Sequence, residues 1–382
     1  MTEVLTSDLP RLLVFLNMRV LQLGPVPPPH GGVQANLSAI RERLLSAGHS
    51  CETIAIARSS EIKLETGVYH PRNAKELFKL LLDLKYDIAH LHVGGDFTAR
   101  LTALAFACGV LPGKKAVLTF HSGGFANSEI GKQARKFSFR GFAASRLDKI
   151  IAVNSEIKNL FLRYGVREEK IEIVAPHFHR QPNPNAEIPA RIESFVQKHR
   201  HVLLAVAGLE THYDLSLQIR VLKSVLKEFS NCGLLIAGSG ELESELKTQI
   251  AATDYAENVL LAGDLPHETI LHLIKRADAL LRTTHFDGDA ISVREALFLE
   301  TPVVATDNKM RPAGVSLIKI GDAQDLTEAI LTVLRAGKKQ KTDKPEDWSN
   351  IDQVVRIYEK LLNQKTTAQI SSIRNPQSQI RN

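Results

Sequence analysis

The stretch Arg19–Ala47, RVLQLGPVPPPHGGVQANLSAIRERLLSA, decides the fold class. It opens with a short apolar run, continues through a loop rich in proline and glycine, and ends with apolar residues at helical spacing from Val33 onward. A strand that leads through a loop into a helix is the first part of a βαβ unit, in which the next strand runs parallel to the first. The stretch therefore predicts a parallel α/β sheet.

The same alternation continues along the chain. Further strand patterns lie at 52–56, 87–92, 115–120, 149–153 and 171–174, and then at 202–207, 233–237, 258–262, 279–281 and 302–306. Helical patterns, among them 215–229 and 242–250, fill most of the intervals. Between the two sets, QPNPNAEIP at 181–189 carries three prolines and no periodicity, which is typical of a linker. We therefore expect two Rossmann-like, doubly wound domains with a cleft between them.

The predicted domain bounds follow from these patterns. We expect an extension outside the fold at 1–17, a first domain at 18–180, a linker at 181–199, a second domain at 200–342, a C-terminal helix at 343–365 and a disordered polar tail at 366–382.

Composition narrows the function classes. Three scattered cysteines in 382 residues argue against a disulfide framework or a zinc site, and they suit a reducing compartment. No apolar run approaches the roughly 20 residues that span a bilayer, and no cleavage site of the secretory type follows the apolar segment at 11–18. The net charge of +6 suits an anionic membrane surface or phosphate-bearing substrates, and no nucleic-acid-binding motif is present. We expect a cytoplasmic protein, and the charge is compatible with a peripheral position on the cytoplasmic face of the membrane.

Ligands of doubly wound sheets bind at the carboxyl ends of the strands, so the loops there supply the candidate residues. In the first domain, Gly31 and Gly32 bring backbone amides to a helix N-terminus, where a phosphate can bind; a tight turn is the alternative. His121 ends a strand beside two glycines, and a structural role is about as probable there as a catalytic one. His90 and His92 share one face of a strand, so that one of them is predicted to be packed.

In the second domain, two segments stand out. Gly238 and Gly240 join a strand to a helix, a pattern common to many α/β turns. The segment FDGDAISVREAL at 286–297 separates Asp287 from Glu295 by seven residues. If a helix begins near Ala290, the amides at 288–290 face a diphosphate while Glu295 reaches ribose hydroxyls. The alternative is a helix with Asp289 as its N-cap and Glu295 in an ordinary ion pair.

Taken together, these motifs resemble the retaining glycosyltransferases of family four, which have the GT-B fold. The resemblance runs from Met18 to about Leu362 and rests on PPHGGV, AGHSCET, DIAHLH, LTFH, IAVNS, GSGEL, the acid-x₇-Glu helix and TPVVATD, in the order of the family. It implies a nucleotide-sugar donor held mainly by the second domain, and transfer with retention without a cofactor or a bound metal.

The resemblance also implies residue roles. Gly31 and Gly32 would close over the phosphates, His121 would face the transferred sugar and Glu295 would bind the ribose. We expect catalytic roles for His121, Asp287 and Glu295, and acceptor-side positions for His30 and His92. The predicted donor-binding set is Gly31, Gly32, Gly208, Glu210, Gly238, Gly240, Gly288, Asp289, Ala290, Ile291, Ser292, Lys309 and Arg311.

The chain departs from the family at two places. The first acid of the pair is Asp287 rather than glutamate, and the segment AGLETHYD at 207–214 lacks the Arg and Lys that many members use to clamp the donor diphosphate. Lys309 and Arg311 are predicted substitutes, with Arg282 and Arg294 as alternatives. A nucleotide-sugar epimerase of the same fold, or a catalytically inactive nucleotide-sugar-binding protein, remains an alternative function.

A basic segment suggests a partner. Residues 131–149 hold six basic residues and three phenylalanines, and on one helix they would form a basic amphipathic face. Such a face could dock on anionic lipid through Lys132, Arg135, Lys136 and Arg140 and bring the site to a lipid-linked acceptor. A solvated face over a core stripe is the alternative.

Overall fold

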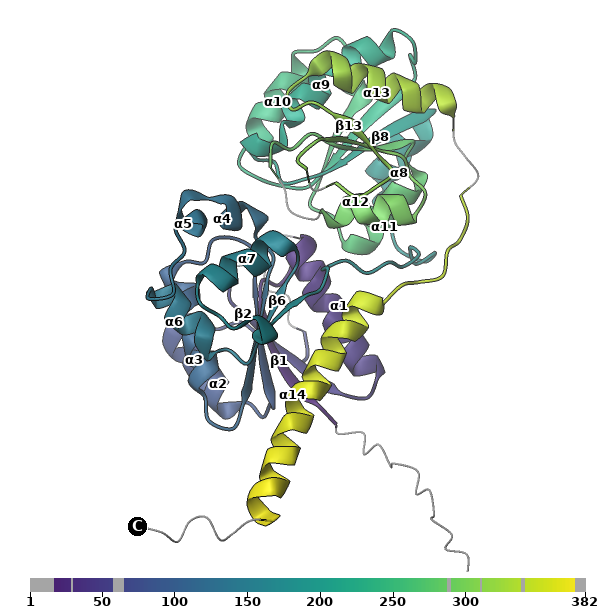
Figure 1. Cartoon of the computed structure of the whole chain (residues 1–382). Helices are drawn as coiled ribbons and strands as arrows, with labels where there is room; N and C mark the ends of the chain where they lie inside the picture. The colour runs from purple at the N-terminus through teal and green to yellow at the C-terminus, as the bar shows by residue number, and fades with distance from the viewer. Residues whose placement is uncertain are drawn as a thin grey trace, which may run out of the picture.

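The computed structural model describes residues 17–28, 30–57, 65–286, 290–309, 311–337 and 341–374, with side chains as far as residue 363. The chain forms two α/β domains, one purple to blue and one green, with the last helix returning from the second to the first (Figure 1). The predicted extension falls almost wholly at 1–16, outside the described residues, and Met18 is already buried in the core of the first domain.

The first domain contains a seven-stranded sheet with the order β3-β2-β1-β4-β5-β6-β7, and every strand pair in it is parallel. Its strands are β1 (Arg19–Gly24), β2 (Ser50–Ala55), β3 (Val68–Tyr69), β4 (Ile88–Val93), β5 (Lys115–Phe120), β6 (Lys149–Ala152) and β7 (Ile171–Ile173). Its helices are α1 (Gly32–Ser46), α2 (Ala74–Asp83), α3 (Ala99–Val110), α4 (Gly123–Asn127), α5 (Glu129–Lys132), α6 (Phe139–Arg146) and α7 (Ser155–Arg163).

The second domain contains a six-stranded parallel sheet with the order β10-β9-β8-β11-β12-β13. Its strands are β8 (His201–Val206), β9 (Cys232–Ala237), β10 (Val259–Gly263), β11 (Ala279–Arg282), β12 (Val303–Thr306) and β13 (Val315–Ile318). Its helices are α8 (Ala190–Lys198), α9 (Leu215–Leu226), α10 (Glu243–Ala251), α11 (His267–Arg276), α12 (Ile291–Phe298) and α13 (Ala323–Ala336). Two parallel doubly wound sheets confirm the predicted fold class.

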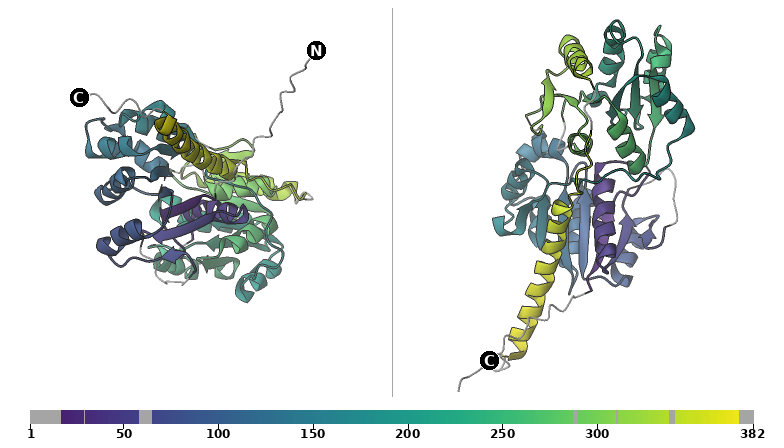
Figure 2. Two further views of the ribbon diagram at one scale, coloured as in Figure 1. Left: turned by 90° about the horizontal axis from the view of Figure 1, so that it is seen from below. Right: turned by 90° about the vertical axis from the view of Figure 1, so that its right-hand side faces the viewer.

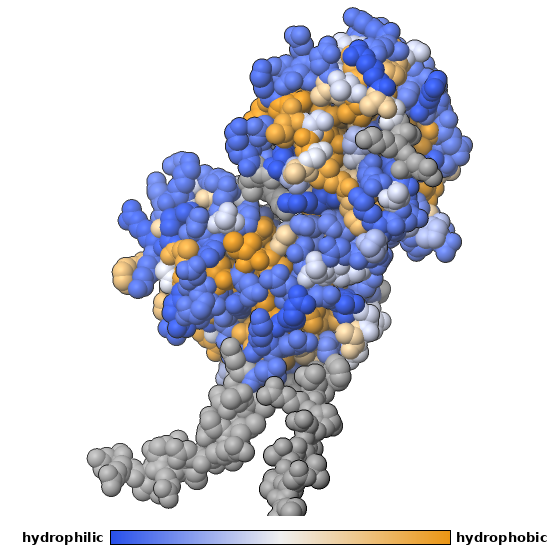
Figure 3. Space-filling model, turned by 45° about the vertical axis from the view of Figure 1, so that its right-hand side comes forward, coloured by the Kyte–Doolittle hydropathy of each residue, from blue (hydrophilic) through white to orange (hydrophobic). Residues whose placement is uncertain are grey.

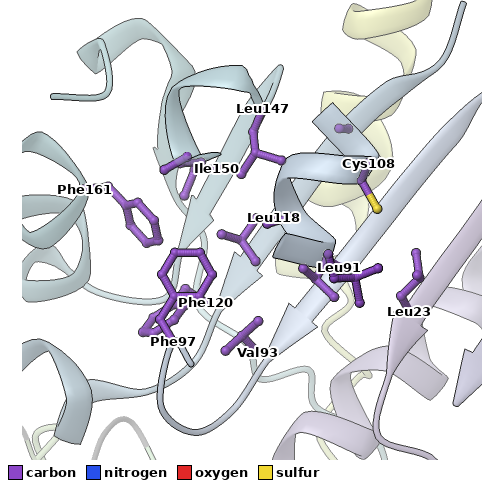
Figure 4. Close-up of a cluster of buried hydrophobic side chains, with 14 of the residues drawn as sticks. Leu23, Leu91, Val93, Phe97, Cys108, Leu118, Phe120, Leu147, Ile150 and Phe161 are labelled. Carbon is purple, nitrogen blue, oxygen red and sulfur yellow. The ribbon is translucent and has the colours of Figure 1, made fainter. Parts of the chain in front are cut away.

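Alternating side chains divide each strand of the first sheet between two cores. Leu21, Leu91 and Leu118 point to the face covered by α2, α3 and α7, where Figure 4 shows Leu91 and Leu118 beside Phe97, Phe120 and Phe161. Val20, Ile88 and Val117 point to the opposite face, against α1 and α14 (Ser349–Arg374). Burial on both faces explains why these strands appear in the sequence as continuous apolar runs.

Two predicted bounds were wrong, and two strands were missed. Residues 190–198 of the predicted linker form α8, which buries Ile192 and Phe195 in the second domain. Helix α14 continues to Arg374, so that it includes part of the predicted tail, while 375–382 lie outside the described residues. Strands β3 and β13 were missed because one has two residues and the other has an exposed centre, which gives neither an apolar run.

The chain returns from the second domain to the first, where helix α14 packs. After the chain leaves the second domain, α14 lies against the first, alongside α1 (Figure 1 and the right-hand view of Figure 2). Ile351, Ile357 and Tyr358 are buried there in the same core as Val20 and Val117. The C-terminal segment is therefore part of the first domain's packing rather than a separate appendage.

Candidate functional site in the interdomain cleft

Loops from the two domains meet at the carboxyl ends of the sheets. His30, before α1, donates its backbone N–H to Oδ1 of Asp264, at 3.0 Å, and its Nδ1 lies 2.9 Å from Oδ2 of the same residue. Asp264 follows β10, so these contacts join the two domains. A Cβ on Gly32 would lie 3.1 Å from Cδ1 of Ile291, the first residue of α12. The structure thus brings the predicted Gly31–Gly32 loop against the start of the acid-x₇-Glu helix.

A row of three histidines follows this loop in the fold, of which His90 and His92 are buried and His121 is half-buried. The ring of His92 is 4.0 Å from that of His90 and 5.8 Å from that of His121, measured between centroids. His90 contacts the Tyr358 hydroxyl through Nδ1 at 2.5 Å and the Thr119 hydroxyl through Nε2 at 2.7 Å. His90 is therefore the packed histidine of the predicted pair.

His92 and His121 differ from His90 in their partners. Both ring nitrogens of His92 and Nε2 of His121 are buried without a hydrogen-bond partner among the described residues. Burial lowers the pKa of His121 to about 4, and burial followed by its histidine neighbours lowers the pKa of His92 well below its usual value. At neutral pH these rings are uncharged, so they can orient a ligand by hydrogen bonding but carry no positive charge.

Glu295 is buried at 3% exposure in α12, and its Oε1 lies 2.5 Å from Nε2 of His267, the first residue of α11. An ion pair of Glu295 was one of the two alternatives weighed from the sequence, but His267 was not singled out. The 28-residue separation carries no periodic signal, and only the packing of α11 against α12 brings the two together.

The start of α12 is described only in part. Asp287, Gly288 and Asp289 lie outside the described residues. Ala290 occupies the N-cap position of α12, and the alternative in which Asp289 caps the helix falls on a residue outside the described ones. Ser292 is buried in the first turn, and Ala290 is 9% exposed. The helix N-terminus predicted near Ala290 is therefore present, and the side chain of its first residue, Ile291, lies against Gly32.

The glycines of the second domain have a packing role. A Cβ on Gly238 would lie 1.8 Å from the Ala207 carbonyl oxygen, and one on Gly240 would lie 2.6 Å from that of Leu209. The loops after β8 and β9 are thus in backbone contact. Close packing accounts for both glycines; their part in donor binding, like that of Gly208 and Glu210 in the loop after β8, stays a prediction.

Three of the four candidate cations, Lys309, Arg311 and Arg282, occupy different surroundings. Lys309 is paired with Asp307 at 2.6 Å, and its side chain is 86% exposed. Arg311 donates through Nε to the Thr306 carbonyl oxygen at 3.1 Å. Arg282, at the end of β11, is 9% exposed, donates through Nη1 to the Val206 carbonyl oxygen at 2.7 Å and lies 4.8 Å from the Tyr213 ring centroid. Arg282 therefore stands beside the loop after β8, where the family resemblance expects a diphosphate clamp.

The basic segment of the first domain does not form one helix. Helices α5 and α6 are separate, because Ser138 begins α6 by accepting the Gly141 N–H at 3.1 Å. Arg140 turns inward and donates to the Phe97 carbonyl oxygen. The predicted continuous amphipathic face is therefore wrong, although Phe137 is 96% exposed and Phe139 and Phe142 are also exposed.

Comparison with known families gives the site its context. Residues 30–177 match the family model described as Glycosyltransferase Family 4, and residues 189–353 match that described as Glycosyl transferases group 1. The chain belongs to the glycosyltransferases of these two domain families.

No helix within the described part of the chain has the length and apolar character needed to cross a membrane. Figure 3 shows mixed polar and apolar residues over one face of both domains.

Curated relatives share part of their length with this glycosyltransferase chain. The amylovoran biosynthesis glycosyltransferase AmsK of Erwinia amylovora is 28% identical over 66% of this chain and 61% of its own. The alpha-monoglucosyldiacylglycerol synthase of Streptococcus pneumoniae is 25% identical over 45% of this chain and 40% of its own. The chain thus spans between about two fifths and three fifths of these two relatives.

Solved structures support the fold. HepE of Anabaena, in complex with UDP and glucose, matches with a TM-score of 0.63 at 16% identity, over 93% of this chain and all of that one. Sucrose-phosphate synthase from Thermosynechococcus elongatus matches with a TM-score of 0.63 at 15% identity, over 90% of this chain and 99% of that one. At such identities the likeness establishes the shared GT-B architecture.

Proposed function

We propose that the protein transfers a sugar from a nucleotide-sugar donor to a glycan or lipid-linked acceptor, with retention of configuration, in surface polysaccharide or glycoconjugate synthesis. The observation that carries this is the meeting of the Gly31–Gly32 loop with the N-terminus of α12, one turn from the buried Glu295. Helix amides at that point favour phosphate, and a carboxylate inside the helix can accept hydrogen bonds from ribose hydroxyls.

Each domain contributes a different set of residues to the reaction. The second domain holds the nucleotide through α12, while the first domain presents neutral His121 and His92 to the sugar and acceptor. In the transfer, an acceptor hydroxyl oxygen bonds to the anomeric carbon as the bond to the diphosphate oxygen breaks. The hydroxyl proton passes to the leaving phosphate, as the family resemblance implies. Preorganised donors lower the barrier by stabilising charge on that phosphate.

The names of the relatives suggest the acceptor class. AmsK is named for amylovoran biosynthesis, and the streptococcal synthase for a glucosylated diacylglycerol. HepE has been solved with UDP-glucose. These names support a glycan or lipid-linked acceptor and make a uridine donor the first to test.

The test is turnover with a panel of nucleotide sugars, read as released nucleotide with and without lipid-linked acceptors. Acceptor-dependent release is expected from the wild type and strongly reduced release from Glu295→Gln. Interconversion of the donor without an acceptor would identify an epimerase instead. Donor binding without any release would identify a non-catalytic nucleotide-sugar-binding protein.

We also propose that the first domain docks on anionic lipid through the exposed aromatic residues and their basic neighbours. Phe137 and Phe139 are exposed, and Lys136 lies 5.6 Å from the Phe137 ring centroid. Apolar insertion combined with basic charge is the pattern of interfacial binding. Flotation with phosphatidylglycerol vesicles should recover the wild type, and Phe137→Ser with Phe139→Ser should abolish recovery. Equal flotation of the variant would refute this surface.

A further inference from the structure

The contact between His267 and Glu295 joins two helices at the side of the second domain that faces the first (Figure 1). His267 begins α11 directly after Pro266, and its side chain is 23% exposed, whereas that of Glu295 is 4% exposed. A carboxylate buried to this degree needs a compensating partner, because removing a charge from water is costly. His267 supplies that partner.

Both connections between the domains pass beside this pair. Phe178, in the first connection, packs against the His267 ring at 6.0 Å between centroids and stacks on Trp348, in the second connection, at 4.9 Å. His179 stacks on Phe298 of α12 at 4.9 Å with an interplanar angle of 9°. Phe178 therefore packs on the ring of His267, and the neighbouring contacts join both connections to each other and to α12.

The charges around the pair favour a protonated imidazole. Burial lowers the pKa of His267, but the charge of Glu295 and the bond to it together raise the pKa by more, so that it lies above its usual value. Arg180 opposes this rise and Glu268 adds to it. Near Glu295, His179 has a pKa lowered mainly by burial and then by His177, while Arg294 lowers it and Asp347 and Glu295 raise it. Below its raised pKa, His267 is cationic; above it, the charge of Glu295 is uncompensated.

We propose that His267 is a positioning residue for the nucleotide-sugar donor: it holds Oε1 of Glu295 and offsets the carboxylate charge, so that a diphosphate can bind close to that carboxylate. This rests on the proposed function, in which Glu295 binds the donor ribose. A donor diphosphate is repelled by an unpaired carboxylate, and the loop after β8 lacks the Arg and Lys expected there. The pair provides a hydrogen-bond acceptor for ribose without adding net negative charge.

The experiment measures the affinity of the full-length protein for UDP-glucose, and for GDP-mannose in parallel, by calorimetry from pH 6 to pH 9. A nucleotide sugar is a diphosphate diester whose phosphates stay ionised over this range, and its base loses a proton only at the alkaline end, so that a pH dependence at slightly acidic and neutral pH arises in the protein. In the wild type, affinity should fall by about 10-fold as pH rises through the raised pKa of His267. His267→Gln keeps an N–H donor but has no charge, and should bind about 10-fold more weakly at pH 6 with no such pH dependence.

His272→Gln is the matched control. His272 lies on the same helix, and its Nε2 contacts the Asn183 carbonyl oxygen instead of a carboxylate, so this variant should keep the wild-type pH profile. His267→Asn serves as a second neutral variant, and thermal unfolding at each pH checks that all four proteins are folded.

The outcomes separate the positioning role from the proposed function. If the wild type binds donor and His267→Gln binds equally well with the same pH profile, the positioning role is overturned while the glycosyltransferase function stands. If the wild type binds neither nucleotide sugar at any pH, the proposed function itself fails, and the role of His267 with it. Loss of the pH dependence in His267→Gln and His267→Asn, but not in His272→Gln, supports the proposal.

Discussion

At the residue scale, the candidate site depends on a few buried polar groups whose partners come from distant parts of the chain. Glu295 is paired with His267 across 28 residues, and His90 with Tyr358 across 268. Each such pair compensates for a polar group removed from water. These pairs satisfy the hydrogen-bonding groups of polar side chains that are buried at the site.

Glu295→Gln tests the donor site directly. The amide can still accept the N–H of His267, but it loses the charge that strengthens hydrogen bonds to ribose hydroxyls. Such bonds contribute about 1.5–3 kcal/mol, so donor affinity should fall by about 10- to 100-fold in a binding titration. The free energy of unfolding should fall only modestly, and most clearly below the raised pKa of His267, where the imidazolium loses its counter-charge. Unchanged donor affinity would assign Glu295 to structure alone.

The diphosphate clamp is tested by separate removal of its candidate cations. Lys309→Ala and Arg311→Ala should lower turnover by about 10²- to 10³-fold if either side chain contacts the leaving phosphate. Arg282→Gln tests the buried alternative beside the loop after β8. The variant that loses turnover should still bind uridine with the wild-type affinity, since the lost contact is to phosphate. Full turnover in all three variants would show that none of these three cations clamps the leaving phosphate.

At the scale of elements, α14 follows the second connection between the domains and packs on the first sheet. Its buried residues lie in one core with those of α1, and the Tyr358 hydroxyl reaches His90 on β4 at 2.5 Å. The helix is amphipathic as far as its described side chains extend, and its apolar side is buried. The sheet face beneath the histidine row is thus closed by a segment from the far end of the chain.

Tyr358→Phe should destabilise the first domain. Loss of the hydroxyl leaves Nδ1 of His90 buried without that partner, at a cost of about 1–3 kcal/mol in the free energy of unfolding. Urea denaturation measures this cost. Tyr255→Phe is the control, because the Tyr255 hydroxyl bonds the Ile219 carbonyl oxygen in a partly exposed place and its loss should cost less. An equal effect of the two changes would argue against a special role for the His90 contact.

At the scale of the whole molecule, the two domains touch directly at the cleft as well as through their connections. His30 and Asp264 join the loop before α1 to the loop after β10 by two kinds of contact, one from the backbone and one from the ring. Since both side chains are partly exposed, the contact can open without a large loss of burial. The contact between His30 and Asp264 can hold the two domains together without substrate. It has to break before a substrate enters between them.

Asp264→Ala should therefore open the cleft. We expect a larger radius of gyration in solution X-ray scattering of the ligand-free protein. Donor affinity should fall by a few-fold, because part of the binding free energy is then used to bring the domains together. Asp254→Ala is the control, as Asp254 pairs with Lys223 on the surface of the second domain alone. Identical scattering curves for Asp264→Ala and the wild type would show that this contact does not hold the domains together.

The sequence by itself determined the two α/β domains, because buried parallel strands must be apolar along their length and their helices must be apolar on one side. It also predicted that one helix begins near Gly31–Gly32 and another near Ala290, as α1 and α12 do; that these places bind a ligand stays a prediction from their position after strand ends. The tertiary structure alone decided the pairing of Glu295 with His267, of His90 with Tyr358 and of His30 with Asp264. These contacts depend on the packing of elements far apart in the chain, and a side-chain contact at such separation leaves no periodic pattern from which it could be predicted.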